Sequence, residues 1–182
     1  MIHIDILTTP RLRLRVITPE VHSYILENHD NEKLQAFFGL ATEADAEKER
    51  EKYHKGITTY KTSFKHFLLL DGGTENVIGW CGYHTWYPEH YRAEIGYHLS
   101  DDIYKRKGLM TEALNKILDY GFNEMQLRRV EALTALDNHA SINLLKKFGF
   151  QFEGVIRQHY NENGINTDSN MYSLLQHEFK PL

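Results

Sequence analysis

The sequence predicts a single-domain α/β (α+β) fold in which a mixed, mostly antiparallel sheet is flanked by helices. Its 182 residues suit one domain, and no repeat, linker or low-complexity tract divides residues 1–182. Charged and aliphatic residues alternate over Arg11–Val16, which is the period of a half-buried strand. Apolar residues recur at helical spacing over Leu109–Phe122, between strand-like segments, which predicts a central βαβα unit.

Two helices are expected in the first third of the chain. Residues 18–20, Thr-Pro-Glu, provide an N-cap, a proline at the first helical position and an early acid, so a helix should extend to about Asn28. A second start at residues 42–45, Thr-Glu-Ala-Asp, leads into a charged stretch up to about Tyr60.

The remaining strands are separated by recognisable turn residues. Asp-Gly-Gly at 71–73 and Asn-Gly at 163–164 are typical of tight turns. Gly149 should end a short helix over Ser141–Phe148. The expected strands are Phe64–Leu70, Val77–Trp86, Ala93–Leu99, Val130–Leu136, Phe152–Tyr160 and Asn170–Phe179.

The composition argues against several classes of protein. A net charge of −4 does not suit a surface built to hold nucleic acid, and the single cysteine cannot form an intrachain disulfide. Cys81 lies in a strand pattern without a recognisable base, so we interpret it as structural. There is no signal-peptide pattern, the apolar run Phe67–Leu70 is too short for a bilayer, and no histidine spacing is typical of a metal site. We expect a cytoplasmic protein without a metal, membrane or direct nucleic-acid partner.

One segment carries a chemical signal. Three basic residues, Lys105, Arg106 and Lys107, precede Gly108, and an amphipathic helix begins at once. The free N–H groups of a helix start attract anions, and glycine lets the backbone approach closely, so the pattern suits a phosphate or pyrophosphate. A solvated turn explains the same local pattern equally well. A P-loop and a dinucleotide fingerprint are both disfavoured, because the required glycines are missing.

Three further segments, two after the basic loop and one near the start of the sequence, are informative together with it. Residues 136–141, Leu-Asp-Asn-His-Ala-Ser, and 144–150, Leu-Leu-Lys-Lys-Phe-Gly-Phe, follow the basic segment after one strand, and residues 9–15 open the chain with Thr-Pro-Arg-Leu-Arg-Leu-Arg. In this order the segments resemble the GCN5-related N-acetyltransferase (GNAT) superfamily, over nearly the whole chain. The branch they resemble most contains the RimJ- and RimL-type enzymes, which acetylate the N-termini of ribosomal proteins.

The resemblance implies acetyl-CoA as the acetyl donor. Its pyrophosphate would lie on the loop and helix start, and its pantetheine arm would enter a gap where the strand ending at residues 97–99 bulges and splays from the Val130–Leu136 strand. A backbone N–H near Leu99 would polarise the thioester carbonyl. Asn138 would meet the pantetheine arm, cap a helix, or do both. The implied cofactor-binding residues are Tyr97, His98, Leu99, Arg106, Lys107, Gly108, Leu109, Met110, Thr111 and Asn138.

The sequence departs from the family pattern at three positions. Lys105 stands where glutamine or arginine is usual, and Met110 stands where a small residue is usual, so its side chain must point into the core. Leu145 occupies the place of a tyrosine that in some relatives protonates the departing thiolate. Ser141 looks like the substitute for that tyrosine in this branch.

The expected mechanism is direct attack of a neutral amine within a ternary complex. Glu94 is the candidate base, acting directly or through a water, because its strand leads to the acetyl site. Equally, Glu94 could be a strand-edge charge paired with Arg92 or another cation. His98 could serve instead, but it should point to the face opposite Tyr97 and Leu99.

The acceptor amine has no recognisable signature. The resemblance favours a protein N-terminus, as on a basic ribosomal protein, and a polyamine or aminoglycoside-type antibiotic is the alternative. A non-catalytic acyl-CoA sensor and, less favoured, a nucleotide-binding protein are competing classes, and a homodimer is suggested by the family alone. Five aromatic residues could line an acceptor cleft or belong to the core: Phe37, Phe38, Trp80, Trp86 and Tyr87.

Overall fold

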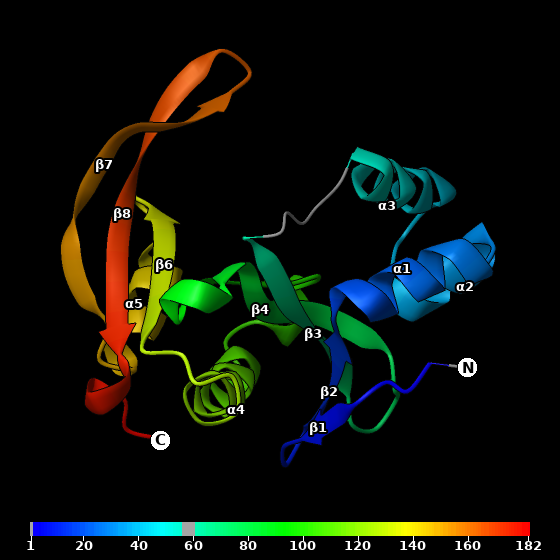
Figure 1. The fold of residues 1–182 in the computed structure, drawn as a ribbon, viewed down its shortest axis with the longest axis horizontal. Coiled ribbons are helices and arrows are strands. Elements are labelled where there is room, and N and C mark those ends of the chain that lie inside the picture. Colours follow the sequence, from blue (N-terminus) through cyan, green and yellow to red (C-terminus); the bar gives the residue numbers. More distant parts are fainter. Residues whose placement is uncertain (1, 56–60) are drawn as a thin grey trace.

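The computed structural model describes residues 2–55 and 61–182 as one continuous sheet with helices on both faces (Figure 1). The sheet has eight strands in the order β1-β2-β3-β4-β5-β6-β8-β7. Only β5 and β6 run parallel, and the other neighbours are antiparallel, so the mixed sheet expected from the sequence is confirmed. No helix within the described ranges is long and apolar enough to span a membrane.

The predicted elements follow one another in the expected order, and the structure adds strand β1 and helix α2 to them. The strands are β1 Ile6–Thr8, β2 Leu12–Ile17, β3 Ser63–Asp71, β4 Val77–Tyr87, β5 Arg92–Leu99, β6 Arg129–Ala135, β7 Gln151–Glu162 and β8 Ile165–Leu175. The α-helices are α1 Pro19–Asn28, α2 Asn31–Phe38, α3 Glu43–Lys55, α4 Leu109–Asn123 and α5 His139–Lys147. Short 3-10 helices cover Pro88–His90, Asp102–Tyr104 and Gln176–Glu178.

Local capping explains the helix starts that the sequence predicted. The Thr18 side chain accepts a hydrogen bond from the N–H of Val21, and α1 ends at Asn28 as expected. Thr42 caps α3 through Asp45 in the same way. The expected stretch over residues 56–60 lies outside the described residues. Two predicted bounds differ by several residues, because β8 begins directly after the 163–164 turn and a 3-10 helix replaces its expected end.

Each face of the sheet has its own core, because strand residues alternate between faces. In β4, Cys81 and Tyr83 are fully buried on the side of α4, and the Tyr83 hydroxyl donates to the Ile117 carbonyl at 2.8 Å. Trp80 lies against the second core, which α1, α2 and α3 build with β3. Burial raises the pKa of the Cys81 thiol well above its ordinary value. The thiol therefore stays protonated and inert, which agrees with its interpretation as a structural residue.

The sheet splits between β5 and β6. These strands pair at three positions, from Arg92 opposite Arg129 to Glu94 opposite Glu131. Beyond Glu94, β5 continues along β4 and β6 continues along β8, so the two strands separate as the family resemblance implied. The bulge implied near residues 97–99 is wrong. Pairing with β4 is continuous from Ile95 to Leu99, and the register shifts instead at His84 of β4.

The contact between α4 and β4 makes a stability prediction. A Cβ added to Gly121 would lie 2.0 Å from the Tyr83 hydroxyl oxygen, inside a fully packed core. Gly121→Ala should therefore lower the free energy of unfolding by about 1–3 kcal/mol, despite the better helix propensity of alanine. Chemical denaturation measures this, with the exposed Asn123→Ala on the same helix as the control. Equal stability of the two variants would contradict the packing described here.

Candidate active site

The basic loop and the start of α4 form an anion-binding geometry. Gly108 is the N-cap of α4 with φ 76°, and Arg106 also has a positive φ of 59°. The first N–H within reach of an intrahelical acceptor is that of Glu112, which donates to the Gly108 carbonyl at 3.0 Å. The preceding amides of α4 thus stand at the positive end of the helix dipole without an intrahelical acceptor. This arrangement fits a diphosphate.

A brace from the N-terminal strands holds this loop, and sequence reasoning missed it. Arg11 Nε donates to Glu112 at 2.7 Å, and Arg11 also donates to the Lys107 carbonyl at 2.9 Å. The Thr9 hydroxyl donates to the same carboxylate at 2.6 Å. The Thr-Pro-Arg segment was visible in the sequence, but nothing local indicated that it meets a helix about a hundred residues away.

A groove of about 630 Å³ runs from this loop to the split in the sheet. It brings together all the predicted cofactor residues except Lys107, whose carbonyl instead anchors Arg11. Met110 is half-buried, packing on the core while also lining the groove, so the constraint expected for its side chain is met in part. His98 is exposed, whereas its neighbours Tyr97 and Leu99 are half-buried. Additional lining residues are Tyr104, Lys105, Ala140, Ser141, Asn143, Leu144 and Lys147.

Two hydroxyl groups meet at the inner part of the groove. Tyr97 OH and Ser141 Oγ lie 2.6 Å apart. Burial raises the pKa of Tyr97 to about 12 against the opposing effect of the Ser141 hydrogen bond, so the phenol stays protonated at neutral pH. Asn138 Oδ1 accepts from the Ser141 N–H at 3.1 Å and caps α5, which leaves the amide N–H groups of Asn138 available to a ligand. Leu145 is fully buried and cannot reach the groove.

The backbone of β5 offers a donor at the split. The N–H of Ser100 donates to the Ile78 carbonyl of β4 at 3.0 Å. Because N–H directions alternate along a strand, the N–H of Leu99 points to the other side, where β6 has already separated. A carbonyl oxygen placed in the gap could accept this hydrogen bond, as the resemblance implied.

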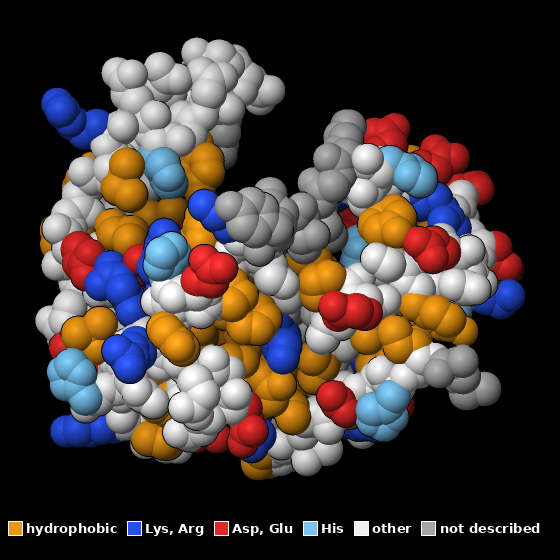
Figure 2. All heavy atoms as spheres, in the orientation of Figure 1, with side chains coloured by type: hydrophobic (Ala, Val, Ile, Leu, Met, Phe, Trp, Pro, Cys, Tyr) orange, Lys and Arg blue, Asp and Glu red, His pale blue; other side chains and the backbone are white. Residues whose placement is uncertain are grey.

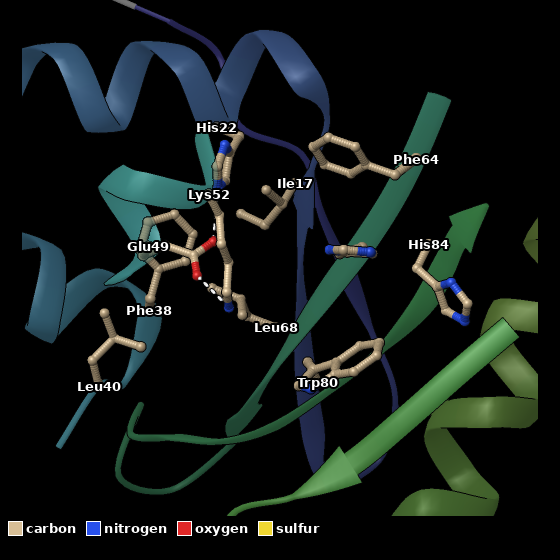
Figure 3. Close-up of a pocket in the computed structure, with 11 residues that line it drawn as sticks. Ile17, His22, Phe38, Leu40, Glu49, Lys52, Phe64, Leu68, Trp80 and His84 are labelled. Carbon is tan, nitrogen blue, oxygen red and sulfur yellow. Dashed lines mark hydrogen bonds and ion pairs between the residues drawn. The ribbon is translucent and has the colours of Figure 1, made fainter. Parts of the chain in front are cut away.

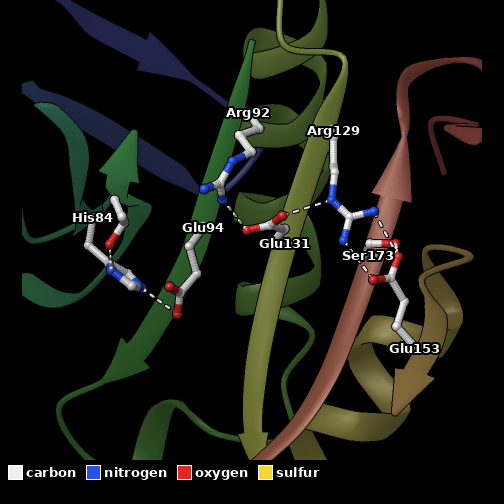
Figure 4. A network of polar contacts seen from close by, with 8 residues as sticks. His84, Arg92, Glu94, Arg129, Glu131, Glu153 and Ser173 are labelled. Carbon is white, nitrogen blue, oxygen red and sulfur yellow. Dashed lines mark hydrogen bonds and ion pairs between the residues drawn. The ribbon is translucent and has the colours of Figure 1, made fainter. Parts of the chain in front are cut away.

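Glu94 stands at the last paired position before the split, on the face opposite α4 (Figure 4). It is not paired with Arg92, which instead donates to Glu131 at 2.7 Å. The Glu131 carboxylate also accepts a hydrogen bond from Arg129. Arg129 donates in addition to Glu153 at 2.7 Å. The partner of Glu94 is His84, with Nε2 3.3 Å from Oε1. The alternative of a strand-edge charge therefore finds a cation partner, although not the expected one.

A second cavity, of about 520 Å³, opens on the same face as Glu94 (Figure 3). It lies between α1–α3 and strands β3 and β4, with Phe38 and Glu49 on the helical side and Trp80 and His84 on the sheet. Figure 2 shows the hollowed outline of this side of the molecule, between the projecting β7–β8 hairpin and α3. The other lining residues are Ile17, His22, Leu40, Lys52, Phe64, His66 and Leu68.

The charges in this cavity are internally compensated. Glu49 contacts His22 at 3.0 Å and Lys52 at 3.1 Å, and chiefly the His22 hydrogen bond lowers the pKa of Glu49 to about 2. Burial lowers the pKa of His66 to about 4, so its ring is neutral at neutral pH. Among the described residues, His66 Nε2 has no hydrogen-bond partner.

Two of the five aromatic residues proposed for an acceptor cleft line this cavity, namely Phe38 and Trp80. The other three face cations elsewhere: Phe37 lies 4.6 Å from Arg15, Trp86 lies 5.7 Å from Lys65, and Tyr87 lies 4.2 Å from Arg92. Cation–π contacts on strand and helix edges explain these aromatic residues without a substrate.

Comparisons with known proteins agree with this geometry. The family model of the acetyltransferase (GNAT) domain matches residues 11–151. The uncharacterized N-acetyltransferase YoaA of Bacillus subtilis is 34% identical over 176 residues, covering 94% of this chain and 97% of YoaA. The spermidine N(1)-acetyltransferase of Escherichia coli K12 is 30% identical over 90 residues, 50% of this chain and 48% of that enzyme.

The structure of RimL, a ribosomal L7/L12 α-N-protein acetyltransferase in complex with coenzyme A, superimposes with a TM-score of 0.67 at 22% identity, covering 94% of this chain and 98% of RimL. At this identity the likeness concerns the fold. Together with the match over residues 11–151, the split sheet and the anion-binding helix start lead to one conclusion. The chain belongs to the GNAT family and is an acetyl-CoA-dependent N-acetyltransferase.

Proposed function

We propose that this enzyme acetylates the N-terminal α-amino group of a protein, such as a ribosomal protein, in the cytoplasm, by direct attack within a ternary complex. The arrangement of the two cavities supports this. The groove of Arg106 and Asn138 lies on the α4 side of the sheet, and the cavity of Trp80 and His84 lies on the other side. We infer that an acetyl group bound on one side reacts at the split beyond Glu94 with an amine bound on the other.

The compensated charge of the acceptor cavity is the observation that favours a protein N-terminus. Among the described lining residues, Glu49 is the one carboxylate, and Lys52 and His22 already hold it. A polyamine would bring several positive charges into a site whose described lining offers no further carboxylate to pair them. An α-amino group brings one charge, titrates at about 8 and needs little help to become neutral near pH 7. The aromatic lining suits a small uncharged first side chain.

A small-molecule amine remains the second candidate acceptor. It is favoured by the similarity of half of the chain to a spermidine N(1)-acetyltransferase. Glu94 and Tyr160 stand outside the cavity lining and could extend the acceptor site, since the charge of Glu94 helps to raise the pKa of Tyr160. A non-catalytic acyl-CoA sensor would bind the cofactor tightly and release no thiol with any amine.

The structure suggests a role for each residue at the split. The amides at the start of α4, with Arg106 and Lys107, would hold the pyrophosphate of acetyl-CoA. The Leu99 N–H would polarise the thioester carbonyl. Ser141, backed by the protonated Tyr97, would return a proton to the thiolate. Glu94 would promote deprotonation of the amine.

Reversing the charge of the loop tests the cofactor site. Arg106→Glu should weaken coenzyme A binding by about tenfold or more, because a carboxylate would face the pyrophosphate. Isothermal calorimetry measures the dissociation constant. The same charge change at Lys48 on α3, far from the groove, should leave it unchanged. No saturable binding by the unaltered protein would contradict the cofactor assignment.

A panel of amines tests the acceptor. Thiol release from acetyl-CoA should be fastest with peptides that begin with serine or alanine, and slower by at least tenfold with spermidine or an aminoglycoside. The control peptide has a blocked α-amino group and a free lysine side chain, which titrates at about 10.4 and should react poorly. Faster thiol release with spermidine would contradict a protein N-terminus as the acceptor and would indicate a polyamine instead. Release with no amine, despite tight coenzyme A binding, would favour the sensor.

Removing the charge of Glu94 tests its role in proton transfer. Glu94→Gln should lower kcat by about tenfold or more while leaving the dissociation constant of acetyl-CoA almost unchanged, because Glu94 lies outside the cofactor groove. Steady-state kinetics and calorimetry on the same preparation measure the two quantities. Unchanged turnover between pH 6 and pH 9 would remove Glu94 from the mechanism.

A further inference from the structure

We propose that His84 is the group that takes the proton from the acceptor amine, and that Glu94 is a positioning residue that acts through His84. The inference rests on the proposed acceptor cavity and deepens it. His84 lines that cavity, whereas Glu94 does not. The imidazole is therefore the member of the pair that lines the cavity (Figure 3), and the Glu94 carboxylate lies beside it on the β5 side (Figure 4).

The backbone of β4 is irregular at His84. Tyr83 lies opposite Ile95 and Thr85 lies opposite Glu94, so His84 is the extra residue of a β-bulge. A bulge redirects the side chain of the extra residue and is frequent next to active sites. Without the bulge, the alternation of β4 would place residues 84 and 85 differently relative to Glu94.

A glycine on the neighbouring strand leaves room for the imidazole. A Cβ added to Gly96 would lie 2.9 Å from His84 Cδ2 and 3.0 Å from the Trp80 ring. Both contacts are tighter than packed carbon atoms normally make, so a larger residue at position 96 would force His84 or Trp80 to move. The space next to Gly96 is thus filled by His84 and Trp80, which both line the acceptor cavity.

Both ring nitrogens of His84 have a partner. Nε2 lies 3.3 Å from Glu94 Oε1, and Nδ1 lies 3.0 Å from the Thr85 hydroxyl. An ionised carboxylate only accepts hydrogen bonds, so Glu94 selects the tautomer with the proton on Nε2. The lone pair is then on Nδ1, beside a hydroxyl that both donates and accepts. His84 Nδ1 is the basic atom, reached directly or through Thr85 Oγ.

The position of this pair matches the chemistry. Glu94 occupies the last pairing position of β5 with β6, and the strands separate immediately after it. Glu94 therefore stands beside the split, and His84 contacts it from the strand that lines the acceptor cavity. In the proposed step, one N–H bond of the ammonium breaks, the proton goes to His84 Nδ1, and the freed electron pair on nitrogen attacks the thioester carbonyl. The C–N bond forms, the C–S bond of the thioester breaks, and the second proton of the amine passes to the departing thiolate through the Ser141 hydroxyl.

The other ionisable groups around the cavity do not replace His84. His22 and Lys52 are engaged with Glu49 on the helical side. His66, on β3, has its pKa lowered to about 4 by burial and, secondarily, by the charge of His84, so it does not compete for the proton near neutral pH. Tyr160 approaches Glu94 from β7 as a neutral phenol. Glu94 is therefore the carboxylate that contacts His84.

The test compares pH profiles of kcat with the best peptide of the amine panel. His84→Gln should lower kcat by on the order of 10²-fold and abolish the limb that imidazole produces as pH rises through its titration range. Glu94→Gln should lower kcat by about tenfold or more, because the amide that replaces the carboxylate can also donate and no longer selects one tautomer of His84. Glu94→Asp should restore part of the lost turnover. Added imidazole should recover activity of His84→Ala, an effect that a merely structural role would not produce.

The matched control is His3→Gln, since His3 Nε2 also contacts a carboxylate, Asp5 at 3.0 Å, but on the exposed surface. It should leave kcat and the profile unchanged. A His84→Gln variant with the wild-type kcat and limb would overturn the proposal, and so would a wild-type kcat in Glu94→Gln. If the unaltered enzyme acetylates no peptide, the proposed acceptor is wrong. The role of His84 is then tested with spermidine, and spermidine turnover that is unchanged in His84→Gln would overturn it.

Discussion

The structure depends on one limited pairing, the three-position contact between the parallel strands β5 and β6. Where they pair, the sheet is continuous between two cores, and beyond Glu94 it is split. The N–H groups of β5 that would have bonded to β6, including that of Leu99, then face the split. Unpaired backbone donors are costly when buried without a partner, so the split favours a ligand that restores the missing hydrogen bonds.

The two sides of the sheet present different chemical groups near this split. On one side, the start of α4 provides helix amides and basic residues, held in place by Arg11 and Glu112. On the other side, aromatic and histidine side chains form a cavity whose charges are compensated within its lining. In the proposed reaction, the strongly anionic acetyl donor would be bound apart from the amine, and the two would meet at the split. Direct transfer needs no covalent enzyme intermediate in such an arrangement.

Locally encoded elements were predictable because their signals lie within a few residues. Thr18 and Pro19 begin α1 through a cap and a preset φ, and the 163–164 turn joins β7 to β8. The helix α2 was missed although Asp30 caps it and Gly39 ends it, because its eight residues bury only Leu34 completely and show little periodicity. The three-residue strand β1 is likewise stabilised by pairing with β2 rather than by its own sequence.

By itself, the sequence determined the order of the main elements, the basic loop before α4 and the family resemblance, because each is written in neighbouring residues. Only the tertiary structure decided which distant groups meet. Arg11 contacts Glu112 of α4, and the bulge lies at His84 of β4 rather than in β5. Glu94 contacts a histidine, His84, whereas Arg92 pairs with Glu131. These pairings depend on strand register, and register follows from how whole faces of the sheet pack rather than from any short motif.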